Sequence, residues 1–139
     1  MWSYGFCVLI FAAVFGVMDF VWLTKAFTTI YQPAIGPMLA EKVRLGPAAI
    51  FYLIYVAGAA FFVVMPAVPT GDWGRAALRG AAFGLVAYAT YDLTNQATLS
   101  VWPTRLTLVD MGWGAFATAV SSTVTVVCGG RALKLLGWS

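Results

Sequence analysis

The chain has no histidine, only two cysteines and few charged residues. Charged side chains make up 9% of its 139 residues, against roughly 25% in an average soluble domain. Without histidine or a CxxC pair a zinc centre is not expected, and no Ser-His or Cys-His catalytic pair can form. We interpret Cys7 and Cys128 as small apolar packing residues, with a disulfide or metal site as the alternative. No cofactor is predicted.

What the chain has instead is apolar sequence. Hydrophobic residues make up 62% of it, and its mean hydropathy is +0.88. A helix needs about 20 apolar residues to cross a membrane, and four stretches are long enough: residues 3–27, 47–68, 76–101 and 106–129. The sequence therefore predicts an all-α, polytopic protein with one transmembrane domain over residues 1–139. Short connections favour four helices in an up-down-up-down bundle.

The connections differ in length. Residues 28–46 are predicted to be the only long loop, with a short interfacial helix at residues 38–40. The other two connections are short turns rich in proline and glycine. Gly80 and Gly84 form a GxxxG pattern that favours close helix packing within the bundle, with a homo-oligomer contact as the alternative.

Charge gives weak information on partners and orientation. The net charge of +3 is typical of basic residues flanking membrane helices, so we expect membrane lipids as partners and no nucleic acid. Basic residues divide evenly between the two ends of the predicted bundle. The terminal amine favours cytoplasmic termini under the positive-inside rule.

Three of the five acidic residues lie inside these apolar stretches: Asp19, Asp92 and Asp110. A charge at the bilayer centre costs between about 3 and 10 kcal/mol, so such residues usually face a protein interior or a wet cavity. At 1.5 Å per residue, Asp19 lies roughly 12 Å from the end of its helix, Asp92 roughly 14 Å and Asp110 roughly 6–9 Å. All three are therefore expected in the half of the membrane opposite the termini.

Other polar and aromatic residues are predicted at the same depth. The third helix repeats them at the i, i+3, i+4, i+7 spacing of one helical face, and each of the other helices contributes some. The candidate ligand-binding residues are Asp19, Trp22, Tyr52, Tyr55, Tyr88, Tyr91, Asp92, Asn95, Asp110 and Trp113. We expect the three acids to approach one another beside Asn95, as candidate ligands of a hard cation. Without a cation, at least one of them is expected to be protonated. The alternative is that these residues only hold the helices together.

The run Tyr88…Tyr91-Asp-Leu-Thr-Asn95 resembles a family of bacterial membrane proteins, the domain of unknown function numbered twenty-one seventy-seven. Asp19-Phe-Val-Trp22, Phe51-Tyr-Leu-Ile-Tyr55, Trp102-Pro103 and Asp110-Met-Gly-Trp-Gly114 extend the resemblance over nearly the whole chain. It implies a small multi-helix protein of the bacterial cytoplasmic (inner) membrane, and it implies no particular activity.

Three hypotheses about function remain open. The first is a site that binds or translocates a small polar, cationic or amphipathic ligand, such as a lipid, entered from the side opposite the termini. The second is a membrane-embedded enzyme acting on a lipidic substrate, because paired carboxylates can divide acid and base roles. The third is a structural or assembly subunit. No catalytic residue is assigned.

Overall fold

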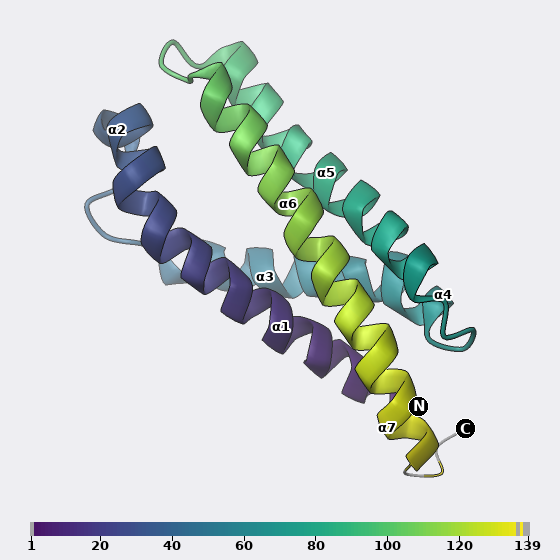
Figure 1. Ribbon diagram of the computed structural model, residues 1–139. Coiled ribbons are helices and arrows are strands. Elements are labelled where there is room, and N and C mark those ends of the chain that lie inside the picture. The colour runs from purple at the N-terminus through teal and green to yellow at the C-terminus, as the bar shows by residue number, and fades with distance from the viewer. Residues whose placement is uncertain (1, 136, 138–139) are drawn as a thin grey trace.

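The computed structural model describes residues 2–135 and 137. Every element in this part of the chain is helical, and the elements join into four long segments (Figure 1). In chain order these are α1 (Trp2–Ala26), η1 (Phe27–Tyr31), α2 (Gln32–Ile35) and η2 (Gly36–Met38); α3 (Leu45–Ala59), η3 (Ala60–Val64) and α4 (Met65–Ala67); α5 (Trp73–Thr98); and α6 (Thr104–Val124), η4 (Thr125–Gly129) and α7 (Gly130–Leu135). The elements η1, η3 and η4 are π-helical turns, and η2 is a 3₁₀ turn.

Three of the four segments are long and apolar enough to cross a membrane: Tyr4–Met38, Leu45–Ala67 and Thr104–Leu133. The helix α5 has 26 residues, which is long enough, but it carries Arg75, Arg79, Asp92 and the two amides Asn95 and Gln96, and these lower its hydropathy. The fold is therefore that of a helical membrane protein with three candidate spans in the described residues.

The predicted long loop at residues 28–46 is wrong. The first helix continues as η1, α2 and η2 to Met38, which leaves residues 39–44 as the connection. The hydroxyl of Thr29 donates to the carbonyl of Lys25 at 2.8 Å, so it supports the helix instead of ending it. Pro33 lies in α2 directly after the π-helical turn η1, and the helix continues through it. The interfacial helix expected at residues 38–40 is also absent, because the helical turns end at Met38.

The ends of the last two long helices also differ from the prediction. The helix α5 begins at Trp73, three residues earlier than predicted, because the Asp72 side chain accepts a hydrogen bond from the Arg75 N–H at 2.9 Å and caps the helix. Such caps are typical of aspartate. It ends at Thr98, and α6 begins at Thr104 directly after Pro103. Helical structure continues beyond the predicted end at residue 129 through α7.

The helices form two groups, α5 with α6 and α1 with α3. α5 and α6 lie side by side and antiparallel, and they make the most extensive contact in the protein (Figure 1). α1 crosses α6 near the chain termini and diverges from it towards α2, while α3 crosses behind (Figure 1). The two chain ends and the turn between α4 and α5 lie at one end; α2 and the α5–α6 connection lie at the other.

An apolar core joins α1 and α3 to α5 and α6, because it also includes Ala117 of α6 and Phe83 of α5. Phe11 and Phe15 of α1 are fully buried and stack with ring centroids 5.8 Å apart. Phe15 also stacks on Tyr55 of α3 at 4.7 Å. Aromatic pairs of this kind contribute about 0.5–1.5 kcal/mol beyond their buried area. The core fixes the crossing of α1 and α3, so the divergence of α1 from α6 begins just beyond it.

Candidate functional site

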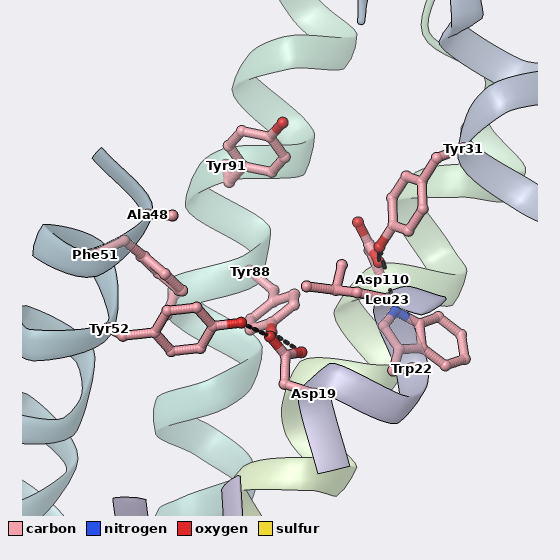
Figure 2. A pocket seen from close by; sticks show the side chains of 11 residues that line it. Asp19, Trp22, Leu23, Tyr31, Ala48, Phe51, Tyr52, Tyr88, Tyr91 and Asp110 are labelled. Carbon is pink, nitrogen blue, oxygen red and sulfur yellow. Dashed lines mark hydrogen bonds between the residues drawn. The ribbon is translucent and has the colours of Figure 1, made fainter. Parts of the chain in front are cut away.

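A cavity of about 450 Å³ lies between the four helical segments, beyond the aromatic core. Its lining residues come from α1, η1, α3, α5 and α6, and Figure 2 shows their side chains: Asp19, Trp22, Leu23, Tyr31, Ala48, Phe51, Tyr52, Ala87, Tyr88, Tyr91 and Asp110. Two are carboxylates, six are aromatic and none is basic. Ligand pockets in proteins typically measure about 300–1,000 Å³ and combine apolar walls with a few placed polar groups.

Asp19 is the best-connected acid of the site. Its side chain is 4% exposed, and it accepts hydrogen bonds from three other helices. The Tyr52 hydroxyl of α3 donates to one carboxylate oxygen. The indole N–H of Trp113 on α6 donates to the other at 3.1 Å, and the Tyr88 hydroxyl of α5 donates to it at 3.4 Å. Asp19 therefore ties the helix groups together at the inner end of the cavity (Figure 2).

The two tryptophans connect the acids in a crossed arrangement. Trp113 shares a helix with Asp110 but donates to Asp19 of α1. Trp22 shares a helix with Asp19 but donates at 3.2 Å to the Tyr31 hydroxyl, which donates in turn to Asp110. The two indoles stack with centroids 4.6 Å apart and planes 7° apart. The sequence predicted each indole on the face of its own acid, whereas the structure exchanges their connections across the helices.

Tyr31 was missed because it falls in the predicted loop. It lies nine residues after Trp22, which in a regular α-helix turns it about 180° away from that face. The π-helical turn η1 ends at Tyr31 and holds more residues per turn than an α-helix, so Tyr31 does not lie on the face that α-helical spacing predicts. Such π turns often mark functional sites. Sequence periodicity at 3.6 residues contains no signal for this change in winding.

Asp92 lies opposite Asp110 in the contact between α5 and α6. Gly80 faces Ser122, Gly84 faces Thr118, and the Tyr88 ring faces Gly114. Each step moves four residues forward on α5 and about four back on α6. One further step pairs Asp92 with Asp110.

The surroundings of Asp92 differ from those of the other two acids. It is 0% exposed, and neither of its carboxyl oxygens has a hydrogen-bond partner in the described part of the chain. Ionised and unpaired carboxylates in protein interiors cost several kcal/mol. Asp92 is not among the residues that line the cavity. It lies behind the cavity wall, in contact with α6.

Six predicted site residues line the cavity: Asp19, Trp22, Tyr52, Tyr88, Tyr91 and Asp110. Of the other four, Trp113 lies behind Asp19 as its donor. Tyr55 is buried and hydrogen-bonded to Thr118 at 2.6 Å. Asn95 is half-buried, one turn beyond Asp92 on α5. The α5–α6 contact therefore turns part of the predicted polar level away from the cavity.

The lining residues that the sequence did not suggest are mainly apolar: Leu23, Ala48, Phe51 and Ala87, besides Tyr31. No pattern distinguishes them from lipid-facing residues of the same helices. Phe51, for example, is 45% exposed.

The structure does not support a hard-cation site built from three acids. In residues 2–135 and 137, no three histidine, cysteine or acidic side chains are placed to hold one metal ion. Asp19 and Asp110 are held by separate tyrosines, and Asp92 is buried in the α5–α6 contact outside the cavity lining. The three acids lie at a similar depth in the bundle, but they are not arranged around one metal position.

Comparison with known proteins agrees with the sequence and the fold. A family profile described as a predicted membrane protein (DUF2177) matches residues 4–127, which include all three acids, both stacked tryptophans and every lining residue. The chain belongs to the DUF2177 family. No curated protein and no solved structure matches it. Its function must therefore be argued from the site.

Acidic and aromatic side chains dominate the lining of this DUF2177 site. The cavity contains no nucleophilic Ser, Cys or Lys among its lining residues. It presents two carboxylates held by tyrosine hydroxyls and several aromatic rings, which together attract positive charge through Coulomb and cation–π interactions.

Proposed function

We propose that this DUF2177 protein binds an amphipathic organic cation, such as a substituted ammonium compound, in the cavity beside Asp19 and Asp110. The observation that carries the proposal is the composition of the lining: two carboxylates, six aromatic rings and no basic residue. Aromatic rings and carboxylates are the groups that bind substituted ammonium ions in proteins.

The size and walls of the cavity favour an organic cation over a bare metal ion. A volume of about 450 Å³ is far larger than an ion requires, and a metal would need three or more converging oxygen ligands. The walls formed by Leu23, Phe51 and Tyr91 suit an apolar body attached to the charged group. The ligand's charge would lie between the two carboxylates and its apolar part against these walls.

The membrane arrangement of this proposal includes α5 as a fourth span. α5 packs along α6 over most of its length, and α6 belongs to a candidate span. Arg75 and Arg79 lie near the N-terminal end of α5. Basic side chains at a helix end can reach the membrane surface. The four segments then run up, down, up and down in the bacterial inner membrane. The termini lie in the cytoplasm, and the cavity lies in the opposite half of the bilayer.

Calorimetry with a small quaternary ammonium compound tests the proposal. Benzyltrimethylammonium keeps its charge at every pH and carries an apolar ring, and benzenesulfonate is a matched anion. The purified protein is expected to bind the ammonium probe and not the sulfonate. Asp19→Asn is expected to weaken binding at least about tenfold, or 1.4 kcal/mol.

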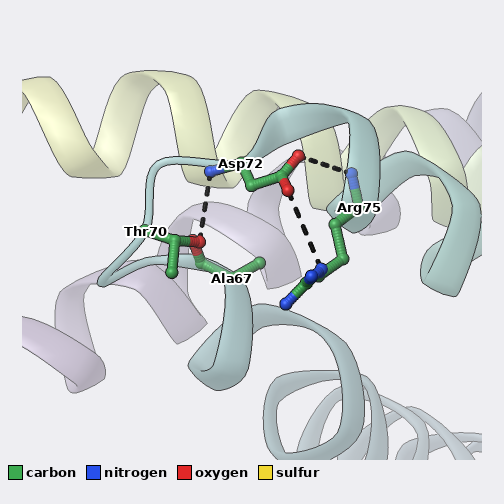
Figure 3. Close-up of polar contacts among 4 residues, drawn as sticks. All are labelled: Ala67, Thr70, Asp72 and Arg75. Carbon is green, nitrogen blue, oxygen red and sulfur yellow. Dashed lines mark hydrogen bonds and ion pairs between the residues drawn. The ribbon is translucent and has the colours of Figure 1, made fainter.

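Asp72→Asn is the matched control. Asp72 lies outside the cavity and caps α5, where it contacts the N–H and the guanidinium of Arg75 (Figure 3). Asparagine caps helices as well as aspartate does, so this variant should bind like the wild type. Equal loss in both variants, or equal binding of cation and anion, would refute a charge-selective site.

A further inference from the structure

The two acids that face each other across α5 and α6 are unequally supplied with partners. Asp110 lines the cavity and accepts a hydrogen bond from Tyr31. Asp92 is fully buried directly behind it, with no hydrogen-bond partner among the described residues. The titratable groups around Asp92 are Asp110 from α6, Tyr31 from η1 and Tyr91 on its own helix.

The difference in hydrogen-bond partners between Asp92 and Asp110 indicates which of them carries a proton in the empty protein. An ionised Asp92 has lost its hydration and has gained no donor in return. It would also face the like charge of Asp110. Two carboxyl groups that face each other are most stable when only one of them is ionised, and they titrate as a unit. Asp110 has a donor for its charged form, so the proton belongs on Asp92.

We infer that the Asp92–Asp110 pair exchanges its proton for the cation that enters the cavity. The inference rests on the proposed cation site. A cation that enters beside Asp110 neutralises one of the two carboxylates, as the proton did in the empty protein. The O–H bond of the Asp92 carboxyl group then breaks, and the proton passes to the facing carboxylate of Asp110, which lines the cavity, and from there to the water on the open side of the cavity. One positive charge replaces another, so the charge of the site is unchanged.

Such an exchange has a measurable stoichiometry. If one proton leaves for each cation bound, linkage requires the affinity for the cation to rise tenfold per pH unit over the range in which the pair is protonated. The permanent charge of benzyltrimethylammonium ensures that any proton released comes from the protein. A site without exchange would bind this probe equally at all pH values.

The experiment combines calorimetry with proton counting. Purified protein in a weakly buffered detergent solution with a pH-indicator dye is titrated with benzyltrimethylammonium, for the wild type, Asp92→Asn and Asp72→Asn. The wild type and Asp72→Asn are expected to release about one proton per probe bound, with a tenfold change in affinity per pH unit. Asp92→Asn is expected to bind the probe with no proton release and no dependence on pH.

The outcomes separate this inference from the proposed function. Binding to the wild type without proton release would overturn the exchange and leave the cation site standing. Proton release that persists in Asp92→Asn would overturn the assignment to this pair. Absence of binding at every pH would overturn both proposals. Because the wild type alone decides whether exchange occurs, the test does not depend on the folding of a variant.

Discussion

The contact between α5 and α6 is tight enough to make a single methyl group strongly destabilising at Gly84. A Cβ atom added to this residue would lie 2.0 Å from the carbonyl oxygen of Gly114 and 2.5 Å from the Thr118 hydroxyl oxygen. The first of these atoms belongs to the backbone, so no side-chain rotation can relieve the overlap. Gly84→Ala must therefore push the two helices apart along their shared register.

The expected loss can be estimated from known overpacking effects. Extra methyl groups in a well-packed core cost about 1–3 kcal/mol, and occasionally more. Because the overlap involves backbone, we expect a decrease in the free energy of unfolding of about 3 kcal/mol. Unfolding of the purified protein by sodium dodecyl sulfate in mixed micelles, followed by circular dichroism, measures this quantity.

Gly112→Ala is the control for this experiment. Gly112 lies on α6, two residues before Gly114, and an added Cβ would meet nothing within 4 Å. Alanine in a helix is favoured over glycine by about 0.5–1 kcal/mol, so this variant should be as stable as the wild type or slightly more so. If Gly84→Ala matched Gly112→Ala within about 0.5 kcal/mol, the register that places Asp92 opposite Asp110 would be refuted.

Three further predictions concern the acids and the membrane arrangement. Tyr52→Phe removes a donor to Asp19 and should lower the free energy of unfolding by about 1.5–3 kcal/mol, while Tyr4→Phe, at an exposed position, should not; equal values would exclude this bond as a stabilising contact. Asp92→Leu should reach the membrane fraction at the level of the wild type, because it removes a buried carboxyl group that has no hydrogen-bond partner among the described residues, and a loss of insertion would instead indicate a structural role. With the cytoplasmic termini proposed above, Ser100→Cys in the α5–α6 connection should react with an impermeant maleimide in intact cells of a cysteine-free background; labelling only after lysis would reverse the proposed orientation.

The shared level of the polar residues could be predicted from the sequence because depth along a helix follows from residue number alone. Asp19, Tyr52, Tyr88 and Asp110 were predicted at one level, and the structure places all four around one cavity. What could not be predicted is which way each residue turns at that level. Asp92 belongs to the same set, yet the α5–α6 register directs it against α6.

The π-helical turns explain most of the remaining differences. Tyr31 donates to Asp110 from the last position of η1, and η1 begins the helical continuation of α1 into the predicted loop. Residues such as Thr28, Thr29 and Pro33 are individually common in loops, yet here both threonine hydroxyls donate to the Lys25 carbonyl and the helix continues through Pro33. Hydrophobic periodicity detects regular helices and does not detect such changes in winding.

A crystal structure with (4-bromobenzyl)trimethylammonium would test the cation site most directly. The anomalous signal of bromine locates the probe independently of the protein model. We expect the ammonium group between Asp19 and Asp110, with the bromobenzyl ring against the aromatic walls of the cavity. A probe found only on the lipid-facing surface of the helices, with the cavity unchanged, would contradict the proposed function.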